Sequence, residues 1–183
     1  MRFIETQVPG AWVIEPELLG DERGWFARTF DAEEFEARGL NPAVVQCNVS
    51  FNARRGTLRG MHYQAEPHGE SKLVRCVRGS IFDVAVDLRR DSPTFCSSHW
   101  VELSAENRCA FYIPAGLAHG FQTLTDDCEV IYQMGHPYVP DAARGVRWDD
   151  PAFGIAWPEP AGERTISEKD RAYPGFELCA AEP

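Results

Sequence analysis

The chain has 183 residues and a formal net charge of −10, with 18 Lys and Arg against 28 Asp and Glu. Its length fits one ordinary domain, and 44% hydrophobic with 25% charged residues is typical of a soluble globular protein, which excludes disordered and fibrous classes. The negative charge disfavours nucleic acid as a partner, and no apolar run reaches the ~18 residues of a membrane span or forms a signal peptide, so we expect a cytoplasmic protein.

Short segments separated by Gly and Pro follow one another along the chain, which is typical of an all-β fold. In chain order, we expect strands at 11–16, 25–30, 44–49, 57–64, 72–78, 81–88, 100–103, 109–113, 120–124 and 128–134. About ten short strands predict a β-sandwich or jelly-roll barrel. We expect one domain over residues 1–183, with a β body over about 1–158 and a C-terminal tail over 159–183 that follows Pro158.

The segments 72–78 and 81–88 show the clearest strand pattern. In the second segment, apolar Phe82, Val84 and Val86 alternate with a set that includes Asp83 and Asp87, so the two carboxylates share the other face of the sheet. The two-residue connection Gly-Ser predicts a tight hairpin between the two segments.

Two short helices are predicted from capping patterns. Asp31 and Glu34 have the spacing of a capping box, Phe35 would face inward, and Gly39 would end the first helix. Ser167 and the acidic residue three positions later have the same spacing and predict a second short helix in the tail.

His62 and His119 are the two histidines with functional potential, because both lie where a predicted strand meets the rim of the fold, and barrel mouths commonly hold ligands. From the pattern alone, a hydrogen-bonded structural histidine is the slightly favoured interpretation of each. His68, His99 and His136 lie in polar or loop contexts and are expected at the surface. A metal site needs three or four converging ligands, so we expect none here.

Several cations stand out against the acidic background: Arg23, Arg59, Lys72, Arg75 and Arg78. Arginine is suited to bidentate contact with phosphate oxygens, and lysine can act as a point charge beside a developing oxyanion. The alternative is that they pair with surface carboxylates, and we prefer it for the last two.

Tyr132 alternates with Val130 and Met134 and therefore shares their face of a predicted strand. A phenol inside a barrel can act as a general acid, although packing with a satisfied hydroxyl is the more common role.

Taken together, these segments resemble the dTDP-4-dehydrorhamnose 3,5-epimerase family. The matches include Thr-Leu-Arg-Gly-Met-His-Tyr-Gln at 57–64 and Ala-His-Gly-Phe at 118–121. Further matching stretches lie at 20–24, 72–75, 82–89, 92–95, 103–107, 113–114, 147–151 and 155–158. The resemblance implies a cupin-type jelly-roll fold, a nucleotide-linked 4-keto-6-deoxyhexose as substrate, and a homodimer whose N-terminal segment helps to complete the neighbour's site. It implies neither a metal nor a redox cofactor.

By resemblance, four residues carry the catalysis. His62 matches the base and Asp170 the carboxylate that orients it, while Tyr132 matches the acid on the opposite face of the sugar and Lys72 the lysine near the keto oxygen. This set is chemically coherent: protons on carbons 3 and 5 are acidic because both carbons adjoin the carbonyl, and a cation stabilises the enolate that forms. Inversion then needs a second group to return the proton on the other face.

The remaining matches are substrate contacts. Arg59 and His119 would lie near the sugar and its phosphates, Arg23, Gln46 and Asn48 would make further contacts, and Tyr138 would lie near the nucleotide.

Arg28 departs from the family pattern, since many members carry there a Glu that contacts the thymine base. A cation cannot accept a hydrogen bond, so this difference bears on the preference for dTDP. The sequence Asn48-Val49-Ser50 replaces Asn-His-Ser, and Pro137-Tyr138 replaces Tyr-Tyr. These changes touch the nucleotide region and leave the catalytic set intact, so we expect retained epimerisation chemistry.

Dual epimerisation at carbons 3 and 5 is the leading interpretation, placed in L-rhamnose supply for surface polysaccharide. The alternatives are epimerisation of carbon 3 alone, an epimerase for a different nucleotide sugar, and a related keto-isomerase. A metal-dependent cupin enzyme and a non-catalytic sugar-nucleotide binding module are alternatives of other classes.

Overall fold

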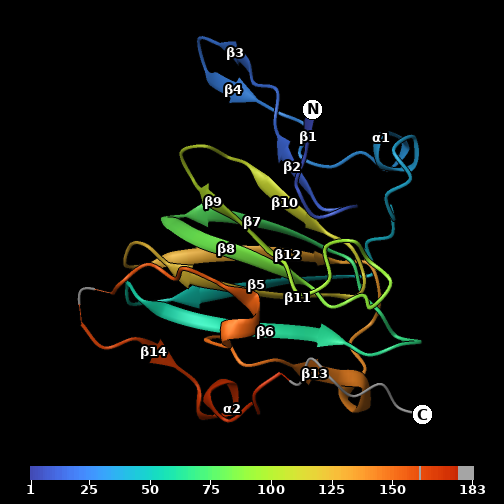
Figure 1. Cartoon of the computed structure of the whole chain (residues 1–183). Coiled ribbons are helices and arrows are strands. Elements are labelled where there is room, and N and C mark those ends of the chain that lie inside the picture. The colour runs from blue at the N-terminus through green and yellow to red at the C-terminus, as the bar shows by residue number, and fades with distance from the viewer. Residues whose placement is uncertain (161, 177–183) are drawn as a thin grey trace.

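Two β-sheets packed face to face make up the body of the molecule (Figure 1). The structure is a computed structural model that describes residues 1–160 and 162–176. Its strands are β1 (Arg2–Glu5), β2 (Trp12–Glu15), β3 (Leu19–Asp21), β4 (Gly24–Phe26), β5 (Gln46–Asn52), β6 (Thr57–Gln64), β7 (Lys72–Arg78), β8 (Ser80–Asp87), β9 (Ser98–Ser104), β10 (Ala110–Ile113), β11 (Leu117–Thr123), β12 (Cys128–Met134), β13 (Ala143–Gly145) and β14 (Thr165–Ile166). The helices are α1 (Ala32–Glu36) and α2 (Glu168–Arg171), with 3-10 turns at Pro140–Ala142 and Pro151–Phe153.

The first sheet has the strand order β1-β2-β10-β7-β12-β5, and the second has the order β13-β6-β11-β8-β9 with β14 added in parallel to β6. Between them lies the main core, to which the first sheet contributes Val74, Phe111 and Val130 and the second Ile81 and Phe121. The sheets stay open at their edges. This all-β jelly-roll sandwich confirms the predicted fold class.

Strand β8 shows how the alternation of its residues serves both faces of the second sheet. Phe82, Val84 and Val86 face outward, where Phe153 and other apolar side chains from the C-terminal part of the chain cover them. The intervening Asp83 faces the interior and is fully buried. The predicted split of β8 into an apolar face and a carboxylate face is therefore confirmed.

The predicted hairpin between 72–78 and 81–88 is wrong, because β7 and β8 belong to different sheets. The Gly-Ser connection carries the chain across the sandwich instead of folding it back. Gly79 has φ +75°, and a Cβ there would lie 2.5 Å from Thr125 Oγ1 and 2.6 Å from Cys128 Sγ. Alternation identifies the face of each strand but not its pairing partner, and a short connection does not require a hairpin.

Both predicted helices are present. Asp31 accepts hydrogen bonds from the backbone amides of Glu33 and Glu34, and Phe35 is buried. Gly39, with φ +71°, follows the end of α1 as expected. In the tail, Ser167 caps α2 by accepting from the amide of Asp170. Among the described residues, no helix is long and apolar enough to cross a membrane.

Four short strands were not predicted: β1, β3, β13 and β14. They have only two to four residues, too few for a period of two to stand out. The strand expected at 25–30 ends at Phe26, because the following residues lead into the cap of α1. Part of the predicted tail, residue 161 and residues 177–183, lies outside the described residues.

Candidate active site

A cavity of about 490 Å³ opens beside strand β6, between the two sheets and the C-terminal segment. Strands of the first sheet supply Ser50 and Tyr132 to its lining, and strands of the second supply Arg59, His62 and Phe121. The remaining lining residues are Thr57, Leu58, Thr165, Ile166, Ser167, Lys169 and Asp170. A ligand in this cavity would therefore contact side chains of both sheets and of α2.

His62 and Asp170 form a hydrogen-bonded pair in this cavity. The imidazole Nε2 lies 2.7 Å from Asp170 Oδ1, and the second carboxylate oxygen accepts from the backbone amide of Gly60 at 3.3 Å. Burial opposes ionisation of Asp170, but the contacts with His62 and the Gly60 amide outweigh it and hold the pKa of this carboxyl below its ordinary value. Asp170 is therefore a carboxylate at neutral pH, whereas its position in the capping pattern alone favours a simple helix cap.

Strand β14 explains how a residue so distant in the sequence reaches His62. Thr165 and Ile166 pair in parallel with Thr57 and Leu58 at the start of β6. The cap at Ser167 then turns the chain into α2, which directs Asp170 toward β6. Two residues of strand and one helical turn thus align the carboxylate with the imidazole.

Tyr132 enters the cavity from the first sheet. Its hydroxyl lies 2.7 Å from Ser50 Oγ, and its ring packs against the rings of Phe121 and His119. Burial raises the pKa of Tyr132 to about 12, although the hydrogen bond with Ser50 acts in the opposite direction. The phenol is therefore protonated at neutral pH and can donate a proton.

A second histidine–carboxylate pair lies behind the cavity. His119 Nε2 is 2.7 Å from Oδ1 of Asp83, which is fully buried. Lys72 is buried beside this pair, donates to the backbone carbonyl of His62 at 3.0 Å and pairs with Glu70 at 2.9 Å. Burial raises the pKa of the Asp83 carboxyl, while His119 and Lys72 oppose that rise.

Arg59 and Lys169 both line the cavity itself. The Nε of Arg59 donates to Asn52 Oδ1 at 2.7 Å. Neither Lys72 nor His119 lines the cavity, since both lie one layer deeper. The structure thus gathers the predicted catalytic residues around β6, and among the predicted cations only Arg59 lines the cavity.

Gln46, Asn48 and Tyr138 lie next to the cavity rather than in its lining. Gln46 and Asn48 share a face of β5 with the cavity-lining Ser50, and Asn48 is directly opposite Tyr132. The backbone amide of Tyr138 donates to Gln46 Oε1 at 2.6 Å. These three residues therefore lie beyond the cavity lining, along β5 and beside it.

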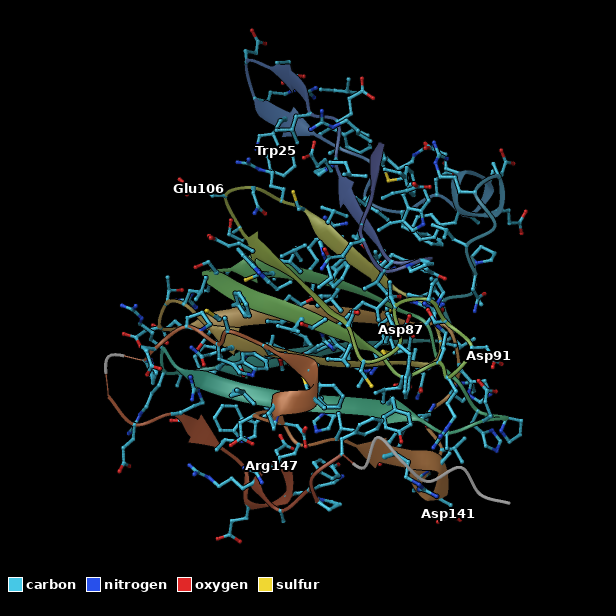
Figure 2. All side chains as sticks on the ribbon, in the orientation of Figure 1. Trp25, Asp87, Asp91, Glu106, Asp141 and Arg147 are labelled. Carbon is cyan, nitrogen blue, oxygen red and sulfur yellow. The ribbon has the colours of Figure 1, made fainter. Side chains whose placement is uncertain are left out.

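Arg23 and Arg28 do not join the other predicted residues within the described part of the chain. Arg23 lies in the turn of the β3–β4 hairpin and pairs with Asp21, while Arg28 donates to Asp31 Oδ2 at 2.5 Å. The β3–β4 hairpin projects from the body (Figure 1). In Figure 2, Trp25 on this hairpin lies at the opposite end of the molecule from Arg147, which follows β13.

Sequence reasoning missed three residues that support the site. Ser50 bonds the Tyr132 hydroxyl, Glu70 neutralises Lys72, and Asp83 bonds His119. Only Asp83 had a usable signal, because the alternation in β8 places it on the inner face. Among the described residues, no group of three or more His, Cys, Asp and Glu side chains is arranged to hold a metal ion.

Comparisons with known proteins agree with this arrangement. The family model described as dTDP-4-dehydrorhamnose 3,5-epimerase matches residues 5–177. The chain is 51% identical over 174 residues to an enzyme of that name from Methanothermobacter thermautotrophicus, covering 94% of this chain and 92% of the relative.

Solved structures of the same family are also similar to this chain. The Elizabethkingia anophelis dTDP-4-dehydrorhamnose 3,5-epimerase superposes with a TM-score of 0.93 at 39% identity, covering 96% of each chain. The Legionella pneumophila dTDP-6-deoxy-D-glucose-3,5-epimerase, solved with dTDP-4-keto-L-rhamnose, has a TM-score of 0.90 at 40% identity and covers 99% of this chain and 95% of that one.

Proposed function

Because the chain belongs to the dTDP-4-dehydrorhamnose 3,5-epimerase family, we propose that it inverts carbons 3 and 5 of dTDP-4-dehydro-6-deoxyglucose by proton abstraction and return. It is an isomerase that acts on a sugar nucleotide. The observation that carries the catalytic assignment is that the His62–Asp170 pair and Tyr132 line one cavity. His62 lies on β6 of the second sheet and Tyr132 on β12 of the first. A sugar ring between the sheets would meet a base on one face and an acid on the other.

His62 acts as the base in this proposal. Its Nε2–H donates a hydrogen bond to the Asp170 carboxylate, which keeps the proton on that nitrogen. The lone pair of Nδ1 is then free to accept a proton from the substrate. Removal of the proton from carbon 3 or carbon 5 moves electron density onto the keto oxygen at carbon 4. The Asp170 carboxylate then stabilises the imidazolium that forms.

The enolate oxygen needs positive charge nearby. We assign this role to Lys72, which donates to the His62 carbonyl from one layer behind the lining, and place Arg59, in the lining, close to the diphosphate. His119 would lie behind the sugar, in the same deeper layer as Lys72. Preorganised charge in a partly dry cavity is commonly the largest contribution to catalysis. Tyr132 then returns a proton to the opposite face of the carbon, and its high pKa keeps the phenol protonated until that step.

We further propose that the enzyme is a homodimer whose β3–β4 hairpins reach the partner's cavity. The hairpin exposes large apolar side chains: Leu19 is 63%, Trp25 54% and Phe26 67% exposed. Exposed apolar surface of this kind commonly marks a protein interface. Arg23 and Arg28 would then supply substrate contacts that they cannot make within their own chain, and Gln46, Asn48 and Tyr138 would bind the nucleotide end.

Hydrogen exchange tests this function directly. The protein is incubated with dTDP-4-keto-6-deoxyglucose in deuterated water, and the protons at carbons 3 and 5 are followed by NMR. Exchange at both carbons with new epimers is the expected result, whereas exchange at carbon 3 alone identifies a mono-epimerase. If neither carbon exchanges, the same experiment with other nucleoside diphosphate sugars tests whether Arg28 has changed the nucleotide preference.

A further inference from the structure

Tyr173 packs against the proposed base from a position just beyond α2. Its ring meets the His62 imidazole edge to face, with 6.2 Å between the ring centroids and 65° between the planes. Edge-to-face packing is a favoured arrangement for aromatic pairs. The contact places an aromatic ring directly against the imidazole.

Gly145 provides the seat for this ring. It lies on β13 directly opposite His62 on β6. A Cβ built on Gly145 would lie 2.2 Å from Cζ and 2.4 Å from Cε2 of Tyr173, and the three atoms nearest to it all belong to that side chain. The tyrosine therefore occupies the space that any side chain at position 145 would need.

The position of Tyr173 also helps to fix the segment that carries the Asp170 carboxylate. Asp170 is carried by a segment that pairs with the body through only two residues of β14, and Tyr173 follows it by three positions. A side chain fixed on β13 at this point anchors the far end of α2, just as β14 anchors the near end.

We propose that Tyr173, seated on Gly145, is a positioning residue that holds the His62–Asp170 pair in its reactive geometry. This inference rests on the proposed function, in which His62 is the base. The aromatic ring performs the task and the hydroxyl is dispensable. Burial raises the pKa of Tyr173, so the phenol brings no charge to the pair at neutral pH.

Kinetics of three variants test the role of the ring. Tyr173→Ala is expected to lower kcat about tenfold or more with little change in KM, because misplacing a catalytic group by a fraction of an ångström slows the chemical step without weakening binding. Tyr173→Phe keeps the ring and is expected to recover most of kcat. Arg171→Ala, an exposed change in the same segment, is the control. An equal loss in Arg171→Ala, or no recovery in Tyr173→Phe, would overturn the proposal.

A double-mutant cycle tests whether the Tyr173 ring depends on the space at Gly145. Gly145→Ala alone is expected to lower kcat, since the added methyl group displaces the ring. In the Tyr173→Ala background the same methyl group has room, and it is expected to cost little more. Effects of the two changes that simply multiply would show that the residues act independently and would contradict the proposal.

A measurement without substrate separates this inference from the proposed function. The imidazole C–H resonances of His62, assigned by their loss in His62→Gln, should shift in Tyr173→Ala and return in Tyr173→Phe. Unchanged resonances overturn the inference. The expected shifts in a protein that exchanges no substrate protons would contradict the proposed function alone. If Tyr173→Ala fails to fold, judged by circular dichroism, Tyr173→Leu takes its place.

Discussion

His62 and His119 lie directly opposite each other on antiparallel strands β6 and β11, yet each imidazole binds a different carboxylate. The His62 side chain is 42% exposed and paired with Asp170, whereas that of His119 is 6% exposed and paired with the fully buried Asp83. Only the first pair lines the cavity, so only His62 can take a proton from a substrate carbon without rearrangement. The deeper pair lies behind the lining, where the His119 ring packs against Tyr132 and Asp83 interacts with Lys72.

Removing the proposed base should therefore slow turnover strongly. His62→Ala is expected to reduce kcat about 10²- to 10⁴-fold, the usual contribution of a positioned general base. Asp170→Asn should have a smaller effect, because the amide keeps the shape of the side chain but not its charge. The measurement is steady-state kinetics with dTDP-4-keto-6-deoxyglucose, with His68→Ala, outside the cavity lining, as the matched histidine control. Near-normal turnover in His62→Ala would show that another residue is the base.

Tyr132→Phe should separate proton removal from inversion. The variant keeps the ring that packs on Phe121 but loses the acid, so His62 still removes protons while return on the opposite face fails. In deuterated water we expect exchange of substrate protons to continue while new epimers accumulate at least about tenfold more slowly. Ser50→Ala is the control, since it removes only the hydrogen-bond partner of the phenol. Equal losses of exchange and of epimer formation would count against Tyr132 as the returning acid.

Asp87 links the stability of the fold to pH. Burial alone would raise the pKa of this carboxyl, but hydrogen bonds from Arg89, Ser92 and Thr94 prevail and lower it from 3.8 to about 2. A pKa lowered on folding stabilises the folded state above the unfolded value, and that stabilisation is lost as pH falls through the folded value. The difference corresponds to about 2 kcal/mol at neutral pH.

Denaturant unfolding of wild type and Asp87→Asn at several pH values checks this account. The variant should be less stable by about 2 kcal/mol at pH 7, and the gap should close between about pH 4 and pH 2. Asp91→Asn, an exposed residue of the loop that follows β8, serves as the control. A gap that stays constant down to pH 2 would show that the Asp87→Asn substitution acts through packing and not through charge.

The alternation in β8 and the capping patterns at Asp31 and Ser167 were sufficient to predict those elements, because both signals are local. The pairing of strands was not predictable in this way. At Gly79 the chain crosses from one sheet to the other instead of forming the expected hairpin. The residues that it contacts there, Thr125 and Cys128, are distant in the sequence.

The candidate site also depends on contacts between residues that are distant in the sequence. His62 and Asp170 are 108 positions apart, and no local pattern brings them together, so their pairing was expected only from the family resemblance. Arg23 matches a substrate contact of the family and Arg28 replaces a residue that contacts the base in many members. In the described chain, Arg23 lies on the β3–β4 hairpin, which projects from the body far from β6 and α2 (Figure 1), and Arg28 lies between that hairpin and α1. In the homodimer that we propose, their contribution would come from a second copy of the chain.

Mixing two inactive variants tests that dependence. If the hairpin of one protomer completes the cavity of the other, a heterodimer of His62→Ala and Arg23→Ala contains one cavity with an intact base and an intact hairpin. Random exchange of subunits from an equal mixture yields half heterodimers, so about a quarter of wild-type activity should return. Light scattering should show the mass of a dimer for each variant. The control is a mixture of His62→Ala with Asp170→Asn, whose defects lie in the same cavity and whose heterodimer should contain no intact one. Activity no greater than the mean of the two separate variants would mean that Arg23 serves its own chain or no site at all.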